Sequence, residues 1–351
     1  MIITLSSIFI IFLSFIITIL LIPKLKIIAI KNNLLDNPNE RKIHQKSISN
    51  LGGIGIYLGS FFSIALLYII ICRFLNISFE KNDLLLFILG PFLLTLLGFF
   101  DDLFNINYKI RLAIQFFISV LIYIFLLKVN FYIDFTWISG NKLFVPAFLS
   151  FSIAILWISG MVNAINWFDG IDGLASSTSV LFSLGLIIIA LDSKDYLALF
   201  FLTSLIGSNL GFLKHNWRPA RIFMGDSGSN FLGFSLAITS LYILKDLNNN
   251  ISLNILLLFF LIPILDMTIV ILNRLKNKRS PFLPDNSHIH YRLLNTGLSV
   301  PKTVLIINFL TQIFMFLSLS LTVKNNWIIF FIFLLILNLF LLFQKSFKLK
   351  T

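Results

Sequence analysis

The sequence predicts an all-α integral membrane protein. Three observations support this fold class: 58% of the 351 residues are hydrophobic, only 12% are charged, and the mean hydropathy is +0.95. A soluble domain carries roughly 25% charged residues, so this chain has too few charges to cover a surface that faces water. The same numbers exclude intrinsic disorder, and the single cysteine, Cys72, excludes a disulfide scaffold. We interpret residues 1–351 as one polytopic membrane domain.

Apolar segments of roughly membrane-spanning length recur along the chain. A helix needs about 20 predominantly apolar residues to cross the hydrocarbon core of a bilayer. Eleven segments approach this length, at residues 2–22, 51–72, 84–100, 113–127, 143–162, 174–191, 196–212, 229–244, 253–272, 303–323 and 327–343. We therefore expect eleven transmembrane helices. Segment 113–127 is the shortest, and segment 229–244 is rich in Ser, Thr and Gly.

Basic residues predict how these helices are oriented. With the N-terminus outside and the C-terminus inside, the loops on the cytoplasmic side hold 20 of the 27 Lys and Arg residues. The positive-inside rule favours this topology. The net charge of +12 is then a property of cytoplasmic loops at a membrane surface, and we expect no nucleic acid partner. Seven of the 13 Asp residues lie in the same loops, which places the candidate chemistry on one membrane face.

The first of these loops mixes acidic and basic residues with a glycine pair. It contains Asp36, Glu40 and His44, and Gly52-Gly53 follows where the second apolar segment begins. On its own, this loop is explained equally well by the positive-inside rule.

A pair of adjacent carboxylates, Asp101 and Asp102, follows the third apolar segment. Neighbouring negative charges at a membrane boundary repel each other, so a positive partner is needed. Lys109, Arg111, a metal ion or a proton can provide that charge. The alternative is a polar helix end in contact with water.

The most informative stretch lies between two apolar segments and reads Asn163-Ala-Ile-Asn-Trp-Phe-Asp-Gly-Ile-Asp-Gly173. Its Asn and Asp side chains recur at every third position, so they share roughly one side of a helix or tight turn. These four residues are Asn163, Asn166, Asp169 and Asp172. Amide and carboxylate oxygens in this arrangement suit Mg²⁺ or the hydroxyl groups of a sugar. A purely structural Asn/Asp turn is the alternative.

The eighth apolar segment opens with Phe223-Met-Gly-Asp-Ser-Gly-Ser229. Helix N-termini bind phosphate through free N–H groups, and Ser227 and Ser229 are residue types that cap helices. Asp226 lies beside them and can hold the Mg²⁺ that accompanies phosphate. A Gly/Ser turn with only a capping role is the alternative.

The last large loop, residues 273–302, is strongly basic. It holds six Lys and Arg residues, Arg279 among them, together with His288 and His290 on either side of Ile289. Two His residues without Cys make a poor zinc site. Contact with phosphate or sugar explains the loop better.

Carboxylates and bases on one face of a membrane protein together indicate phosphoryl transfer. The carboxylates predict Mg²⁺, with Mn²⁺ as an alternative, and the bases and helix N-termini predict phosphate. The simplest reaction joins a soluble nucleotide donor to a lipid acceptor at the membrane surface. Two other classes stay open: a secondary transporter, in which an intramembrane acid such as Asp266 couples ion movement, and a non-catalytic scaffold.

The motifs Asn163-x-x-Asn-x-x-Asp-Gly-x-Asp-Gly and Phe-Met-Gly-Asp-Ser-Gly-Ser, with the Asp101-Asp102 pair, resemble those of a known superfamily. It comprises the polyprenyl-phosphate N-acetylhexosamine-1-phosphate transferases of glycosyltransferase family 4, which start bacterial O-antigen, teichoic acid and peptidoglycan lipid intermediates. The resemblance extends from Asp36 to Arg292, with the loops in the family's order. It implies transfer of a sugar-1-phosphate from a UDP-sugar to undecaprenyl phosphate, with release of UMP. It further implies a multi-pass protein of the bacterial inner membrane with a cytoplasmic active site, and it leaves a homodimer open.

Position by position, the resemblance assigns roles to the motif residues. Asp226 matches the Mg²⁺ ligand, and Asp172 is expected to be a second ligand. Asp101 and Asp102 match a pair assigned to the lipid phosphate, so these two and Asp226 are the expected catalytic residues. Asn216 and Phe223 fall where the family contacts uracil. The expected substrate-binding residues are Asn163, Asn166, Asp169, Asp172, Asn216, Phe223, His288, His290, Arg279 and Lys109.

A pattern in the ninth segment belongs to the same resemblance. Pro263, Asp266 and Arg274 match it, and we expect Asp266 to be buried near the site, because an intramembrane acid without a partner is costly. A hydrogen bond between two helices is the alternative role for Asp266.

Two departures from the family's pattern concern the sugar. Ser47-Ile-Ser49-Asn50 stands where relatives usually have prolines and a base, and Tyr291 stands where a further His is common. The form His288-Ile-His290 resembles the N-acetylglucosamine branch of the family. UDP-N-acetylglucosamine is therefore the expected donor. Other UDP-N-acetylhexosamines, a 6-deoxy sugar or the muramoyl-pentapeptide, are the alternatives.

Overall fold

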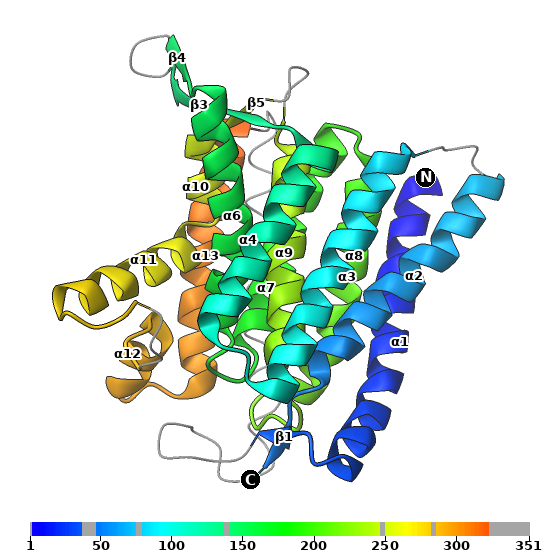
Figure 1. The fold of residues 1–351 in the computed structure, drawn as a ribbon. Helices are drawn as coiled ribbons and strands as arrows, with labels where there is room; N and C mark the ends of the chain where they lie inside the picture. Colours follow the sequence, from blue (N-terminus) through cyan, green and yellow to red (C-terminus); the bar gives the residue numbers. More distant parts are fainter. Residues whose placement is uncertain are drawn as a thin grey trace.

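The computed structural model describes residues 2–36, 47–74, 79–136, 141–245, 250–281 and 286–322. Figure 1 shows a bundle whose long helices run roughly parallel to one another. The predicted span 327–343 lies outside the described residues, as do Glu40, His44 and Asp285.

Ten of the eleven predicted segments coincide with helices. Most of these segments are apolar on all sides, as expected of helices that contact both lipid and one another. The helices are α1 (Ile2–Lys31), α2 (Gly52–Phe74), α3 (Lys81–Phe104), α4 (Tyr108–Ile122) with a π-helical extension η1 (Tyr123–Leu127), α6 (Ala147–Phe168), α7 (Leu174–Asp192), α8 (Tyr196–Asn216), α9 (Gly225–Ile243), α10 (Leu253–Phe259), α11 (Leu261–Lys276), α12 (Ile289–Asn295) and α13 (Val300–Thr322).

The expected number of eleven spans is not confirmed. In the described part of the chain, seven helices are long and apolar enough to cross a membrane: α1, α3, α4 with η1, α6, α7, α8 and α13. The count rises to eight if α10 and α11 form one span, although they meet at a bend of 85°. In α2 the apolar helix is shorter, Gly52–Leu66, and α9 is not among the spans because Ser, Thr and Gly occupy much of it.

The polar helix α9 forms the centre of the bundle. Every residue from Ser227 to the end of the helix is buried, and α9 packs mainly against α3 and α6. Glycine makes this close packing feasible, because a side chain at Gly98 of α3 would collide with the backbone of Asp226. Small residues bring membrane helices together in this way. A helix too polar to face lipid is thus enclosed by protein.

Short strands mark the two ends of the bundle (Figure 1). At one end β3 (Asn130–Phe135) pairs antiparallel with β4 (Asn141–Phe144) and parallel with β5 (Asn250–Ser252). At the other end β1 (Leu35–Asp36) pairs antiparallel with β2 (Ile48–Ser49). The last turn of α3, the turn between α6 and α7, and the start of α9 lie at this second end. We call it the site end and the sheet end the far end; the strands are a small addition to the predicted all-α fold.

Helix α11 leaves the bundle at an angle (Figure 1). Its buried residues include Asp266, Val270 and Arg274, which are spaced by four and therefore share one face. Leu265 and Leu272 are exposed. α11 leads into α12, which packs against α13 and comes close to the α6–α7 turn.

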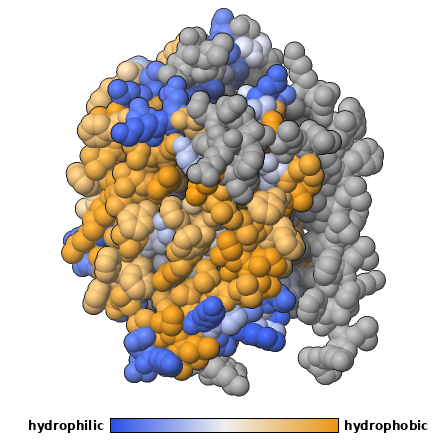
Figure 2. Space-filling view, turned by 90° about the vertical axis from the view of Figure 1, so that its right-hand side faces the viewer, coloured by the Kyte–Doolittle hydropathy of each residue, from blue (hydrophilic) through white to orange (hydrophobic). Residues whose placement is uncertain are grey.

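The surface has the hydropathy of a membrane protein. Figure 2 shows a broad hydrophobic band with hydrophilic residues gathered toward its two ends. Large apolar side chains are open on several helices; Phe12, Phe117 and Leu321 are each 63% exposed. In water such a surface would be unfavourable, whereas the hydrocarbon core of a bilayer accommodates it. The chain is therefore a multi-pass membrane protein.

Candidate active site

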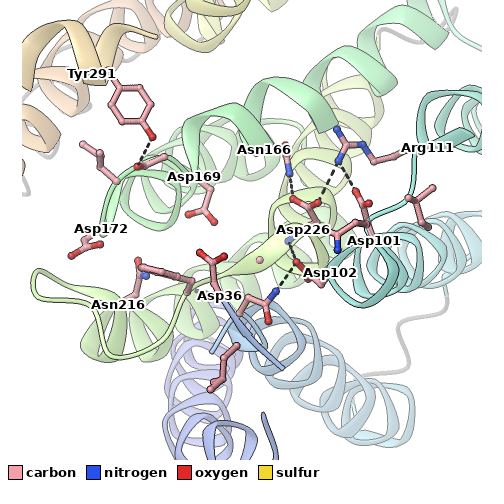
Figure 3. A pocket seen from close by; sticks show the side chains of 18 of the residues that line it. Asp36, Asp101, Asp102, Arg111, Asn166, Asp169, Asp172, Asn216, Asp226 and Tyr291 are labelled. Atoms are coloured by element: carbon pink, nitrogen blue, oxygen red, sulfur yellow. Dashed lines mark hydrogen bonds and ion pairs between the residues drawn. The ribbon is translucent and has the colours of Figure 1, made fainter. Parts of the chain in front are cut away.

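The site end contains a cavity of about 740 Å³ (Figure 3). Its walls come from β1, the end of α3, the start of α4, the α6–α7 turn, the α8–α9 loop and α12. Loops that are far apart in the sequence therefore converge on one cavity. The predicted residues that line it are Asp101, Asp102, Asn166, Asp169, Asp172, Asn216, Phe223 and Asp226.

Asp102, in the last turn of α3, caps the N-terminus of α9. Its Oδ1 accepts a hydrogen bond from the backbone N–H of Asp226 at 3.0 Å, and its Oδ2 accepts one from Ser227 N–H at 3.1 Å. The first N–H groups of a helix have no partner within it and attract negative charge. Asn50 Nδ2 adds a third bond, to Oδ1, at 3.1 Å. Asp102 thereby fixes the start of α9 and places Asp226 at the cavity wall.

Arg111 of α4 lies between the other two predicted catalytic carboxylates (Figure 3). Its Nη1 is 2.5 Å from Asp101 Oδ2 and 3.3 Å from Asp226 Oδ2. Asp101 is only 5% exposed, and a buried carboxylate needs such a cation to offset its lost hydration. Of the two bases that can compensate the Asp pair, the structure therefore uses Arg111. Lys109 is exposed and does not line the cavity.

Asn166 of α6 orients the second oxygen of Asp226. Its Nδ2 donates to Asp226 Oδ1 at 2.6 Å and to Ser229 Oγ at 2.9 Å. Arg111 contacts Oδ2, so donors from two helices hold the two oxygens of one carboxylate on a third helix. The position of Asp226 is thus determined by three parts of the chain.

Asp169, in the α6–α7 turn, differs from these carboxylates because its side chain has no hydrogen bond among the described residues. Burial raises the pKa of Asp169 well above its usual range, and the negative charges of Asp226, Asp102 and Asp172 raise this pKa further. Such a carboxylate, with like charges nearby and no donor, becomes favourable as an anion when a cation binds.

The carboxylates fit a magnesium–nucleotide complex. Among the described residues, no group of three or more His, Cys, Asp or Glu residues is arranged to hold a metal. Mg²⁺ at nucleotide sites is usually held by one or two carboxylates, and substrate phosphates and water complete its shell. Asp226 and Asp169, whose side chain has no hydrogen-bond donor among the described residues, supply two carboxylates at the cavity wall. This donor set suits Mg²⁺ with a diphosphate.

The predicted second metal ligand, Asp172, lies across the cavity from Asp226 (Figure 3). Its Oδ2 accepts hydrogen bonds from Arg218 Nη1 at 3.1 Å and from Ala220 N–H at 3.0 Å. The two predicted metal ligands line the same cavity, but Asp172 is engaged by Arg218 and Ala220 whereas Asp226 is held by Arg111 and Asn166. Asp169 lies between them in this view, and of the neighbouring charges that raise its pKa that of Asp226 acts most strongly.

Asn216, expected at uracil, connects two loops. Its Oδ1 accepts from Gly173 N–H and its Nδ2 donates to the Ile222 carbonyl, both at 2.9 Å. The side chain is buried, with its oxygen and its nitrogen both engaged in protein contacts. Asn216 thus shapes the cavity wall by holding the α6–α7 turn against the α8–α9 loop. Phe223 lines the same wall.

Two further predicted substrate-binding residues, like Lys109, do not reach the cavity. Asn163 donates through Nδ2 to Gln115 Oε1 at 2.7 Å and to the Ser159 carbonyl at 2.8 Å. It lies about one helical turn deeper in the bundle than Asn166, although both belong to one motif. Arg279 is exposed beyond the end of α11 and is absent from the cavity lining.

Asp266 is buried, as predicted, and it holds the start of α12. Its Oδ2 is 2.8 Å from His288 Nδ1, and its Oδ1 accepts a hydrogen bond from Ile289 N–H at 2.7 Å. The partners are therefore in the loop and in α12 rather than in another membrane helix. Asp266 thus connects α11 to the predicted histidine pair.

His290 packs directly against Gly170 of the α6–α7 turn, where a larger residue would collide with its ring. Burial, together with the neighbouring His288, lowers the pKa of His290 to about 3, so the ring is neutral at physiological pH. Neither His288 nor His290 lines the cavity. The neighbouring Tyr291 does, and its hydroxyl donates to the Gly170 carbonyl at 3.4 Å.

Sequence reasoning missed four polar residues that line the cavity. Asn105 and Arg218 were not singled out for the site, and Asn50 and Tyr291 were noted only as parts of departures from the family's pattern. The position of Arg218, within the basic run before Phe223, is the one signal that pointed to it.

The amino-acid sequence matches a family model and several named proteins. A family model described as Glycosyl transferase family 4 matches residues 84–244, which include the ends of α3, α6 and α9 that meet at Asp226. A Bacillus subtilis (strain 168) protein named "Probable undecaprenyl-phosphate N-acetylglucosaminyl 1-phosphate transferase" is 34% identical over 323 residues, which cover 91% of this chain and 87% of that protein. The chain belongs to glycosyl transferase family 4.

Two more relatives of this family 4 chain carry similar names. A Thermotoga maritima protein is 31% identical over 296 residues, 84% of each chain. An Escherichia coli (strain K12) protein is 29% identical over 287 residues, 80% of this chain and 74% of its own length. Both are named undecaprenyl-phosphate alpha-N-acetylglucosaminyl 1-phosphate transferase.

Proposed function

We propose that this chain transfers N-acetylglucosamine-1-phosphate from UDP-N-acetylglucosamine to undecaprenyl phosphate and releases UMP. The names of the relatives support both substrates. The observation that carries the proposal is the carboxylate of Asp226, held between Arg111 and Asn166 in a cluster of aspartates at one end of a membrane bundle. The product starts the synthesis of a cell-envelope polysaccharide.

The reaction exchanges one phosphoanhydride bond for another. An oxygen of the lipid phosphate attacks the β-phosphorus of UDP-N-acetylglucosamine, which carries the sugar. The bond from that phosphorus to the bridging oxygen breaks, and UMP leaves with this oxygen. A fully ionised lipid phosphate has no proton to lose, so the task of the protein is to position the two substrates and to neutralise their charge.

Mg²⁺, with Mn²⁺ as the alternative, fits the cavity as the partner of the donor's diphosphate. Asp226 and Asp169 are the residues that would hold it, and phosphate oxygens would complete its shell. When bound, such an ion neutralises charge on the diphosphate and on the leaving UMP. Asp172, which pairs with Arg218, lies on the wall of the same cavity.

Arg111 is the cation best placed to contact a phosphate beside Asp226. Its Nη1 is shared between two carboxylates, while its Nε is buried without a partner among the residues that the structure describes. A guanidinium donates several hydrogen bonds from one plane and suits phosphate oxygens for this reason. Arg111 thus serves both as the counter-charge of the Asp cluster and as a hydrogen-bond donor to a substrate phosphate.

The site end faces the cytoplasm of a bacterium in this proposal, and the protein lies in the inner membrane with its N-terminus outside. The loops assigned to the site side hold most of the Lys and Arg residues, which agrees with the positive-inside rule, and UDP-sugars are cytoplasmic. The homodimer stays a prediction.

A donor assay tests the proposal. Purified protein in detergent, undecaprenyl phosphate, Mg²⁺ and labelled UDP-N-acetylglucosamine should yield UMP and labelled lipid in equal amounts. The same assay with other UDP-N-acetylhexosamines, among them a 6-deoxy sugar and the muramoyl-pentapeptide, identifies the preferred donor. Turnover of a different sugar alone would refute the donor assignment. Absence of any product, while a relative is active in parallel, would refute the function.

A further inference from the structure

Two amide side chains, the buried Gln115 and the partly buried Asn163, join α4 to α6 about one helical turn below the carboxylates. Asn163 Nδ2 donates to Gln115 Oε1 at 2.7 Å. Gln115 is only 1% exposed, and neither residue lines the cavity. The pair therefore does not touch the substrates, and any effect on the reaction must pass through the helices that carry it.

This amide pair lies in register with the side chains that hold Asp226. Gln115 follows Arg111 by four residues on α4, and Asn163 precedes Asn166 by three residues on α6. Residues at these spacings share one side of a helix. The two helices are thus linked twice on the same side: once through the amide pair, and once through Asp226, which both Arg111 and Asn166 contact.

Apolar contacts alone would fix α4 only weakly. Its buried residues are few, namely Gln115, Ile118, Ser119 and Ile122. The opposite side is open, with Phe117 63% exposed and Ile110 56% exposed. Apolar contact is not directional, so it tolerates sliding and rotation of a helix, whereas a hydrogen bond requires one geometry. The Gln115–Asn163 bond supplies that geometry for α4 on α6.

Stability alone does not explain a glutamine at this position. Gln115 Nε2 is buried and has no partner in the described part of the chain. A buried amide donor without a partner is unfavourable, and a leucine or methionine of similar size would avoid this cost. The residue type is better explained by what it positions.

We propose that Gln115 and Asn163 are positioning residues for the sugar-phosphate transfer, and this inference rests on the function proposed above. They fix α4 on α6 so that Arg111 Nη1 stays within reach of Asp101 and Asp226. Without the pair, α4 shifts, and the guanidinium at its site end moves away from the reacting phosphates.

Gln115→Leu tests the proposal, with Gln312→Leu as the matched control. Gln312 is a buried glutamine of α13, a helix that packs mainly against α7, α10, α11 and α12. We expect Gln115→Leu to lower kcat about 10- to 100-fold, because a displacement of about 1 Å costs up to 10²-fold. The KM for undecaprenyl phosphate should change less than about three-fold, and Gln312→Leu should retain activity within about two-fold. If Gln115→Leu does not fold, Gln115→Met replaces it.

A double-mutant cycle with Arg111 shows whether the amide pair affects the reaction through Arg111. If the pair acts through Arg111, Gln115→Leu has less than about a two-fold further effect on kcat in an Arg111→Ala background. Restoration of kcat by the exchanged pair, Gln115→Asn with Asn163→Gln, would add support. Full and independent losses in the double variant, or unchanged kcat in Gln115→Leu, would overturn the positioning role. An inactive wild-type protein would instead overturn the proposed function.

Discussion

The two ends of α3 both carry acidic side chains, and the structure uses them in different ways. At the far end, Asp83 Oδ2 accepts one short hydrogen bond, of 2.6 Å, from the Tyr242 hydroxyl. At the site end, Asp101 and Asp102 belong to a cluster with Asp226, for which Arg111 is the nearby cation. Asp195 and Glu80 lie near this bond, but Asp83 has its own hydroxyl donor and makes a structural contact. Several acids that share one cation form a site for a further positive charge.

The same contrast appears in the loops. At the far end, hydrogen bonds from the hydroxyl and the backbone N–H of Thr136 lower the pKa of Asp134. At the site end, burial and neighbouring carboxylates raise the pKa of Asp169. Asp169 therefore differs from Asp134 because its side chain lies among other carboxylates without a donor, whereas an Asp at a helix end does not by itself mark a site.

Asp226→Asn should have the largest effect on transfer activity, because it removes a carboxylate from the cluster that distinguishes the site end of α3 from the far end. Loss of its negative charge removes the carboxylate that Arg111 and Asn166 hold toward the cavity. We expect transfer to fall on the order of 10³-fold or more, with membrane insertion unchanged, measured as labelled lipid formed. Asp83→Asn is the matched control, because an amide oxygen still accepts from Tyr242. Equal losses in both variants would contradict the distinction.

Arg111→Ala should have the next largest effect. This substitution leaves the buried Asp101 without its cation and removes a hydrogen-bond donor to the substrate phosphate. We therefore expect kcat to fall about 10²-fold. Arg111→Lys should retain part of the activity, because an ammonium keeps the charge but not the planar set of donors. Lys109→Ala, at an exposed position two residues away, should stay within about two-fold of the wild type. A larger loss of activity in Lys109→Ala would instead assign the role of the site's cation to Lys109.

Asp169 should make stability depend on pH. Its pKa is higher in the folded protein than in the unfolded chain, so the folded state binds its proton more tightly. The stability this group contributes is present at low pH and is lost as the pH rises through the raised pKa. Without Mg²⁺, Asp169→Asn should therefore melt higher than the wild type at pH 8, on the order of a few °C, with a smaller difference at pH 5.

Thermal melts at the two pH values, with and without Mg²⁺, check this prediction. Mg²⁺ should raise the melting temperature of the wild type more than that of the variant. A variant that melts lower than the wild type at pH 8 without Mg²⁺ would show that Asp169 is stabilised by a donor, like Asp134.

The smallest effect should come from Asp134→Asn. The lowered pKa of Asp134 means that its contribution is present at neutral pH and is lost as the pH falls through this value. We expect a decrease in melting temperature on the order of 1 °C at pH 7 and transfer activity within about two-fold of the wild type. A substantial loss of activity would show that the far end takes part in the reaction.

The sequence predicted the members of the cavity better than their individual contacts. Spacing and residue type were sufficient for Asp101, Asp102, Asp169 and Asp226, because polar residues between apolar segments must collect at a membrane face. The repeat of three did not separate Asn163 from Asn166, since both lie on one side of α6 while only the second is near enough to Asp226.

Tertiary packing determined the rest. Lys109 and Arg111 are equivalent by composition, and the orientation of α4 alone decides which reaches the carboxylates. Gln115 lies within an apolar segment and gave no signal of its partner on α6. The span count was not confirmed within the described residues, because hydropathy only weakly distinguishes a buried helix such as α9, or a bent pair such as α10 and α11, from straight spans.

A Mn²⁺ titration followed by electron paramagnetic resonance tests most directly whether clustered carboxylates mark the site. In the presence of UDP-N-acetylglucosamine, the wild-type protein and Asp83→Asn should each bind Mn²⁺ with the same affinity, and Asp226→Asn should lose this binding. Retained binding in Asp226→Asn, or loss in Asp83→Asn, would contradict the assignment of the site to this end of α3.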